Sequence, residues 1–217
     1  MTDTTKKILY GAGIFIVIVV FLWGAWALVG SGGNTSSKPV VIPIDQTDHI
    51  TGNPKSNITF VEFSDFQCPA CKAYVFLAKQ LNEKYKSKVR FVYKHFPLPI
   101  HNLSRQAALA AIAASKQGKF WEMHDILFDK QEKWSVESDP KKFFVNYAKQ
   151  LKLDIKQFEK DMESKESKTK MENDLTLGNQ IGVNATPSFY INGKKIQAPQ
   201  TLDEFSKIID RELKTTQ

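Results

Sequence analysis

Residues 58–71 read ITFVEFSDFQCPAC, and the fold is decided within this stretch. It begins as a run that is apolar on both alternating faces apart from Glu62, which is typical of a central, covered strand. Apolar residues at helical spacing then follow from Tyr74 to Tyr85. Cys68 and Cys71 are the only two cysteines in 217 residues. The stretch therefore predicts a strand-to-helix junction with a Cys-Pro-Ala-Cys sequence at the start of the helix.

Two thiols at a helix start have a specific chemistry. The unpaired N–H groups and the positive end of the helix dipole favour an anion there, so we expect the pKa of the Cys68 thiol to be lowered. Cys71 lies one turn further along, near enough to close a disulfide with Cys68. Pro69 suits the first helical turn, where its missing N–H costs little. The pair is interpreted as a thiol–disulfide exchange centre that needs no other cofactor.

Three other interpretations of the pair remain. A structural zinc site needs four ligands, but the chain has no second cysteine pair, and its histidines (His49, His95, His101 and His124) are scattered, so we predict no metal site. A structural disulfide would close a very short loop and add little stability. Two inert buried thiols are the third alternative. The position of the pair at a strand-to-helix junction favours redox chemistry.

The charge of the chain restricts its partners. The chain carries 30 Lys and Arg against 23 Asp and Glu, a net charge of +7. These charges are spread along the chain, with no basic block interleaved with aromatic residues, so we predict no nucleic-acid partner. Attraction to an anionic membrane surface is compatible with the charge.

The N-terminal region predicts a membrane anchor. Residues 8–30 are uncharged and apolar, and as a helix they would span about 34 Å, enough for a bilayer core. Residues 1–7 contain Lys6 and Lys7, which places this end in the cytoplasm and the body of the protein outside. A cleaved signal peptide ending near Ala27 is the alternative. In both cases the domain is exported to a compartment that permits disulfides.

The remaining chain divides into a linker and three parts. We predict a linker over 31–56, a first α/β part over 57–100, a helical insertion over 101–183 and a second α/β part over 184–217. The expected strands are 40–44 at a sheet edge, 58–63, 89–93, and the Asn192-Gly193 hairpin of 188–191 and 195–197. A turn is expected over 51–57 and a closing helix over 201–213. The charged run 164–172 is interpreted as a solvated helix face.

This order of elements resembles a thioredoxin fold interrupted by a helical domain, the layout of the DsbA family of exported thiol oxidoreductases, with the membrane-anchored BdbD type as the nearest comparison. The resemblance covers about residues 57 to 213. It is carried by four stretches: EFSDFQCPAC (62–71), FPL (96–98), FWEMH (120–124) and ATPSF (185–189). It implies an α/β fold, with the transmembrane helix placed before it.

The resemblance also implies roles for residues away from the cysteines. Thr186 and Pro187 match a loop whose proline is cis and faces the disulfide; the alternative is a trans proline that opens an edge strand. Glu62 matches a buried acid beneath the active-site helix, where it exchanges a proton with Cys71. Burial should raise the pKa of Glu62, unless its side chain reaches the sheet edge. Lys94 is the nearest candidate for a lysine partner, without an assignment.

Together these features predict an extracytoplasmic enzyme that introduces disulfides into reduced secreted or cell-surface proteins. By resemblance, a quinone-linked thiol oxidase of the membrane would reoxidise it. Ala70 stands where some members carry histidine, so the protein should be a weaker oxidant than the strongest of the family. The alternatives are an exported reductase or isomerase, and a redox-inactive surface binding or chaperone module.

Overall fold

The protein is described by a computed structural model over residues 38–215. The predicted cytoplasmic residues 1–7, the predicted membrane span 8–30 and the first part of the predicted linker lie outside the described residues. Among residues 38–215, no helix is long and apolar enough to cross a membrane.

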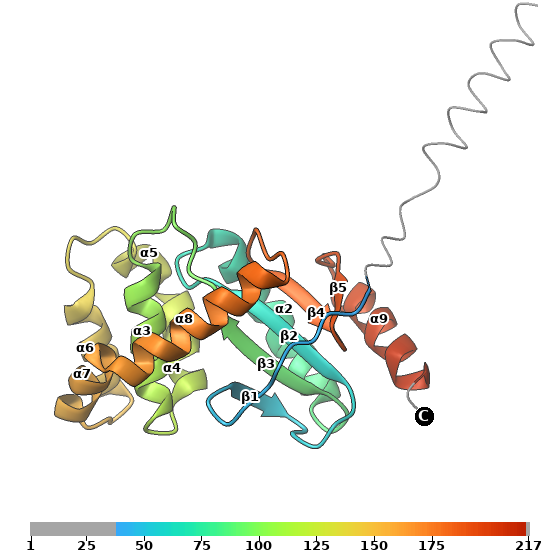
Figure 1. Ribbon diagram of the computed structural model, residues 1–217. Coiled ribbons are helices and arrows are strands. Elements are labelled where there is room, and N and C mark those ends of the chain that lie inside the picture. The colour runs from blue at the N-terminus through green and yellow to red at the C-terminus, as the bar shows by residue number, and fades with distance from the viewer. Residues whose placement is uncertain (1–37, 216–217) are drawn as a thin grey trace, which may run out of the picture. The chain divides into compact units, whose positions relative to one another are not determined.

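The described chain forms a five-stranded sheet with helices on both of its faces (Figure 1). The strand order is β1-β3-β2-β4-β5. The strands are β1 (His49–Gly52), β2 (Thr59–Ser64), β3 (Arg90–His95), β4 (Ser188–Ile191) and β5 (Lys194–Ile196). The helices are α2 (Pro69–Tyr85), α3 (Ser104–Ser115), α4 (Phe120–Asp129), α5 (Gln131–Trp134), α6 (Lys141–Gln150), α7 (Ile155–Glu163), α8 (Lys165–Gln180) and α9 (Leu202–Thr215). The predicted thioredoxin-like α/β fold is confirmed.

The pairing of the strands brings distant chain segments to one end of the sheet. β2 and β3 are parallel and are connected through α2, as predicted. β4 lies antiparallel to β2, with Phe63 opposite Ser188. The end of β2 and the start of β4 therefore meet at the same end of the sheet. The Asn192-Gly193 turn, where both residues have positive φ, lies at the other end and closes the predicted hairpin.

Each face of the sheet has its own core. One face packs against α2 and α9 around Phe60, Phe91 and Phe205. The other face packs Val61, Phe63 and Val92 against apolar residues of α8 and of the segment 40–44. Figure 1 shows α8 passing in front of the sheet and α2 behind it. Because side chains alternate along β2, Glu62 lies on the α2 face with Phe60.

Close packing of α8 depends on a glycine. A Cβ at Gly178 would lie 2.5 Å from the Phe96 ring, so only glycine permits this approach. The helices between β3 and β4 share a further core, in which the alanines of α3 are fully or almost fully buried beside Phe128, Trp134, Phe144 and Phe158. Small residues along α3 allow the surrounding helices to pack closely on it.

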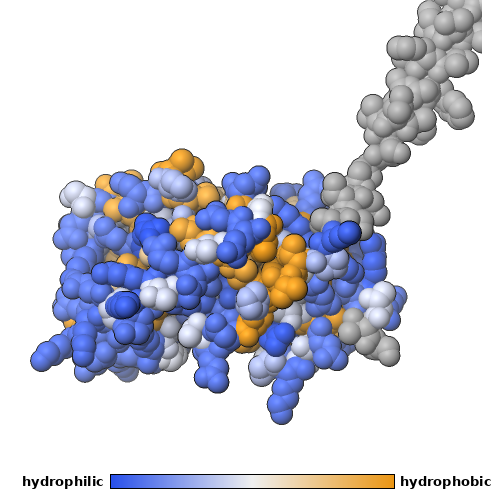
Figure 2. Space-filling model, viewed as in Figure 1, coloured by the Kyte–Doolittle hydropathy of each residue, from blue (hydrophilic) through white to orange (hydrophobic). Residues whose placement is uncertain are grey.

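The segment before the sheet differs from the prediction. Val40, Ile42 and Ile44 do point to one side, but they pack over the sheet face rather than pairing at its edge. Pro39 and Pro43 have no N–H to donate, so this segment is poorly suited to a ladder. Figure 2 shows hydrophobic surface gathered over the middle of this face, where the segment crosses the strands in Figure 1.

The edge strand is instead β1, in the region predicted as linker and turn. It pairs antiparallel with β3, and its last residue, Gly52, has φ +78°. A Cβ there would lie 2.4 Å from the Val89 carbonyl oxygen, so the strand ends at a position that requires glycine. The predicted linker over 31–56 therefore extends too far along the chain.

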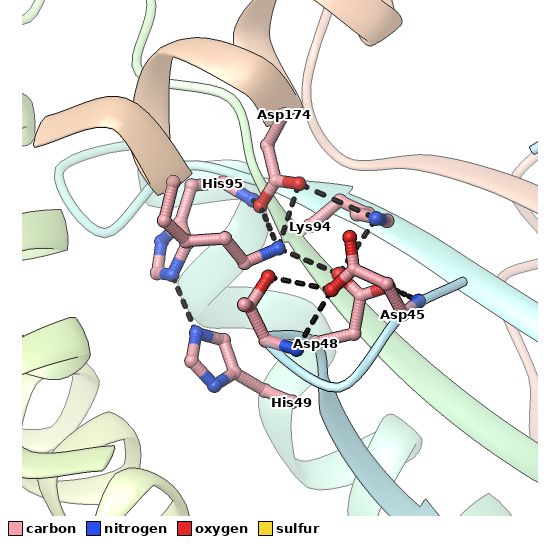
Figure 3. A network of polar contacts seen from close by, with 8 residues as sticks. Asp45, Asp48, His49, Lys94, His95 and Asp174 are labelled. Carbon is pink, nitrogen blue, oxygen red and sulfur yellow. Dashed lines mark hydrogen bonds and ion pairs between the residues drawn. The ribbon is translucent and has the colours of Figure 1, made fainter. Parts of the chain in front are cut away.

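The charged run 164–172 is not wholly solvated either. Lys170 is buried and its ammonium lies 2.6 Å from Asp48 and 2.8 Å from Asp174. Lys94 contacts the same two carboxylates, at 2.6 Å and 3.3 Å. Figure 3 shows Asp48, Lys94 and Asp174 converging from the segment before β1, from β3 and from α8. We call Asp48, Lys94, Lys170 and Asp174 the buried ionic cluster.

Candidate active site

The two cysteines lie where the sequence predicts them. Cys68 is the N-cap of α2 and Pro69 occupies its first turn. The Cys68 N–H donates to the Asp65 carbonyl at 3.1 Å, and the Cys68 carbonyl accepts from the Lys72 N–H at 3.2 Å. Both cysteines are free thiols. The sulfur of Cys68 is therefore carried by the residue at which the helix begins.

The two thiols are electrostatically unequal. The pKa of Cys68 is lowered to about 5, first by a hydrogen bond from the Cys71 thiol, then by Thr186 and by the N–H groups of Cys71 and Ala70, against the opposing effect of burial. The pKa of Cys71 is raised by burial and by the neighbouring Cys68 and Glu62. Cys68 is 6% exposed and Cys71 1%. The helix start thus contributes to the acidity of Cys68, but the Cys71 thiol contributes most.

The loop of Thr186 and Pro187, which is distant in sequence, faces Cys68. The Thr186–Pro187 peptide bond is cis, as the resemblance implies. The Cys68 thiol lies 3.5 Å from the Thr186 carbonyl oxygen, to which it can donate. β4 begins directly after this loop, so its pairing with β2 brings residues 118 positions apart into contact.

Glu62 lies beneath α2, in a cavity of about 280 Å³. Glu62, Tyr93 and His124 line the cavity. Val75 and Lys79 of α2 also line it. Burial raises the pKa of Glu62, while the Ser64 hydroxyl and His124 lower it. Glu62 is the neighbour of Tyr93 in the sheet. Its proton exchange with Cys71 stays a prediction, and Glu62 is near enough to contribute to the raised pKa of Cys71.

Lys94 is not the partner of Glu62. It projects from β3 on the opposite face of the sheet, where it belongs to the buried ionic cluster. The alternation of side chains along β3 explains this placement, because Tyr93 and not Lys94 shares the face of Glu62. Strand pairing could have predicted Tyr93, but His124 is contributed by α4 and its position depends on the tertiary fold.

A buried carboxylate, that of Asp65, orders the turn before Cys68. Asp65 accepts hydrogen bonds from the Leu98 N–H and the His101 ring at 2.8 Å each, from the Gln67 N–H at 2.7 Å and from the Ser104 hydroxyl at 2.5 Å. It thereby joins the turn before Cys68 to the loop after β3. In the sequence His101 appeared only as one of four scattered histidines, and its contact with Asp65 was not predicted.

No metal site is found among the residues that the structure describes, where no group of three or more His, Cys, Asp or Glu side chains could hold an ion. The lowered pKa of Cys68 and the raised pKa of Cys71 suit these groups to thiol chemistry. They present one acidic thiol at the helix start, one buried thiol of raised pKa and a partly buried carboxyl group near the second thiol.

Comparison with known proteins agrees with this site. A family model described as thioredoxin matches residues 45–211. A probable disulfide bond formation protein D of Bacillus anthracis is 34% identical over 174 residues, covering 77% of this chain and 79% of that protein. The solved structure of oxidised BdbD from Bacillus subtilis has a TM-score of 0.70 and 27% identity, covering 79% of this chain and 96% of that one.

The chain also matches part of much longer proteins. The Na(+)/H(+) antiporter NhaA 3 of Salinispora tropica is 33% identical over 180 residues, covering 82% of this chain but 27% of that protein. The chain thus spans about a quarter of the length of this relative. These matches agree with the sheet order, with the acidic cysteine at the start of α2 and with the loop of Thr186 and Pro187. The chain therefore belongs to the thioredoxin-fold thiol–disulfide oxidoreductases of the DsbA and BdbD type.

Proposed function

We propose that the protein is a membrane-tethered, extracytoplasmic oxidase that introduces disulfides into reduced secreted or cell-surface proteins. The observation that carries the proposal is the inequality of the two thiols, with the pKa of Cys68 at about 5 and that of Cys71 raised. A cysteine of low pKa is a good leaving group, and a stabilised thiolate in the reduced form makes the disulfide form a stronger oxidant.

The reaction begins with the Cys68–Cys71 disulfide. A substrate thiolate attacks the Cys68 sulfur, the bond between the cysteines breaks, and its electron pair passes to the Cys71 sulfur. Cys71 takes up a proton because its raised pKa disfavours the thiolate, and protonated Glu62 is the proposed donor. A second substrate thiolate then attacks the substrate sulfur of the mixed disulfide and expels Cys68 as a thiolate. The substrate is oxidised to a disulfide and the protein is reduced to a dithiol.

The proposed location rests on sequence features outside the described residues, and the proposed oxidase partner rests on the resemblance to the family. Residues 8–30 would hold the protein in the lipid bilayer, with residues 1–7 in the cytoplasm. A quinone-linked thiol oxidase of the membrane would return the dithiol to the disulfide. Fractionation of cells, with protease added outside, tests this topology: accessibility only after the membrane is opened would contradict it.

The activity is tested with cysteine variants and a reduced protein substrate. Cys68→Ser should lose disulfide formation, because the attacked sulfur is gone. Cys71→Ser, given the oxidised form of the substrate, should instead accumulate a mixed disulfide visible on a non-reducing gel. The Cys68 thiolate opens the substrate disulfide, one substrate sulfur leaves as a thiolate, and no Cys71 thiol is present to resolve the new bond. Substrate oxidation by Cys68→Ser at the wild-type rate would overturn the proposal. The direction of electron flow is tested by equilibration against glutathione, where an oxidase should lie near the −120 mV end and a reductase near about −270 mV.

A further inference from the structure

The short helix α5 is hydrogen-bonded to the backbone around Cys68. Gln131, its first residue, is 4% exposed. Its side-chain amide donates to the Phe66 carbonyl at 2.8 Å and to the Cys68 carbonyl at 3.0 Å. A residue from the helices between β3 and β4 thus holds two backbone oxygens on either side of Gln67, next to the reactive sulfur.

A second glutamine makes the reciprocal contact. The Gln67 amide donates to the carbonyl of Ser135, the residue that follows α5, at 3.1 Å. Its side-chain oxygen accepts from the Leu103 N–H at 2.8 Å. Each of the two segments therefore sends an amide to the backbone of the other. We call Gln67 and Gln131 the glutamine bridge.

The helix that carries Gln131 is itself firmly held. Trp134, at its end, is fully buried, and its indole N–H donates to the Leu127 carbonyl of α4 at 2.7 Å. The Trp134 ring also packs against Phe144 of α6. Because α5 is anchored in the helical core, Gln131 provides a fixed point for the backbone of Cys68.

The orientation of the Cys68 backbone determines which hydrogen-bond donors lie near its sulfur. Cys68 is the N-cap, with ψ 121°, so no helical turn precedes it. Its backbone is held by the Asp65 carbonyl, by the Lys72 N–H and by Gln131. The low pKa of its thiol depends in part on N–H groups of Cys71 and Ala70 in the first turn. A small rotation of the Cys68 backbone would move the sulfur away from these donors. Holding the carbonyls of Phe66 and Cys68 opposes that rotation.

We propose that Gln131 is a positioning residue for Cys68, through which the helices between β3 and β4 set the reactivity of the redox pair. The inference rests on the proposed function for its consequence in catalysis. We infer that Cys68 forms a thiolate readily, and is readily expelled from a mixed disulfide, only while α5 holds the adjacent carbonyls.

The test compares two glutamine-to-methionine variants of the full chain. Gln131→Met keeps the length of the side chain but removes the donor. Gln117→Met is the matched control, since the Gln117 amide also donates to a backbone carbonyl, that of Asp154 at 3.1 Å, but joins two helical segments away from the cysteines. The readouts are the rate of Cys68 alkylation by iodoacetamide against pH in the reduced protein, and the reduction potential against glutathione.

Gln131→Met should raise the midpoint of the alkylation profile by about one pH unit, so that the rate below the midpoint falls about tenfold. The potential should become about 30 mV more negative, which corresponds to the same tenfold change. Gln117→Met should match the wild type in both readouts.

An unchanged profile in Gln131→Met, or an equal shift in Gln117→Met, would overturn the inference. If Gln131→Met does not fold, Gln131→Asn replaces it, because the amide is kept but withdrawn by one methylene, and the same shift is expected. The alkylation profile needs no protein substrate. Failure of the proposed oxidase activity in the wild type is therefore distinguishable from failure of the role of Gln131.

Discussion

At the scale of single residues, the active site shifts the pKa values of two chemically identical thiols in opposite directions. Cys68 and Cys71 are three positions apart, but one is at the helix start and near Thr186, while the other is buried near Glu62. Each position shifts the pKa of its thiol in the direction that the proposed reaction needs. The asymmetry has a measurable consequence for stability as well as for rate.

The stability of the reduced protein should depend on pH through Cys68. The pKa of this thiol is about 5 in the folded protein against an ordinary 9.0. Between these values the unfolded chain binds more protons, so the free energy of unfolding rises with pH. The contribution is complete near pH 9 and is lost as the pH falls through about 5. Above pH 9 the raised pKa of Cys71 acts in the opposite direction.

Urea unfolding of the reduced and oxidised forms at pH 4 and pH 8 measures this effect. The disulfide form has no thiol to titrate, so the reduced form should gain stability relative to it between the two pH values. Reduced Cys68→Ser serves as the control and should lack the gain. An equal difference between the two forms at both pH values would contradict the low pKa of Cys68.

Replacement of Glu62 tests its predicted role in proton transfer. Glu62→Gln keeps the shape of the side chain but cannot deliver a proton to Cys71. Reduction of the disulfide by a small thiol should slow by about a hundredfold, the lower end of what a positioned proton donor contributes. Stopped-flow tryptophan fluorescence between pH 6 and pH 8 measures the rate. A wild-type rate across this range would show that Cys71 obtains its proton elsewhere.

At the scale of elements, β2 and α2 were predictable because local patterns determine them. The apolar run of β2, the proline at the start of α2 and the Asn192-Gly193 turn each encode their structure within a few residues. β1 was missed because only four residues form it, and its pairing with β3 determines the strand. Asp65, His124 and Gln131 were missed for a related reason: each acts on a distant part of the chain. Asp65 accepts from the Leu98 N–H, 33 positions away, and Gln131 donates to the Phe66 carbonyl from another element. His124 reaches the cavity of Glu62 from α4.

The buried ionic cluster shows how one element depends on another. Lys170 lies in a charged run that gave no sign of burial, but it joins α8 to the segment before β1. Lys170→Met should lower the free energy of unfolding by about 3–5 kcal/mol, because it leaves buried carboxylates without sufficient counter-charge. Urea unfolding at pH 7 provides the measurement.

A matched control for this variant is available on the surface. Lys207 pairs with Asp203 at 2.7 Å, with both side chains more than 70% exposed. Lys207→Met should leave the urea midpoint almost unchanged, because water screens such a pair. Similar losses in the two variants would mean that the cluster contributes no more than a surface ion pair.

At the scale of the whole molecule, the active site lies where the sheet and the helical core meet. Cys68, Cys71 and Tyr93 belong to the same apolar cluster as α3 and its neighbours. The glutamine bridge and Asp65 add polar contacts across this boundary. The fold class was predictable from the order of elements, but these contacts form only when all parts are assembled. The unit 38–217 is therefore expected to carry the chemistry as a whole.

Two truncations separate the chemistry from the tether and define where the folded unit begins. A chain starting at Lys38 should exchange thiols in solution like the full protein, because it keeps every described contact of the site. A chain starting at Asp45 should lose about 3 kcal/mol of unfolding free energy, about 1 kcal/mol for each of the partly buried Val40, Ile42 and Ile44. It also loses the hydrogen bond from the Val40 N–H to the Gly193 carbonyl. Equal urea midpoints would show that the segment only connects the folded unit to what precedes it, whereas a lower midpoint with unchanged alkylation of Cys68 would show that it stabilises the far face of the sheet without acting on the site.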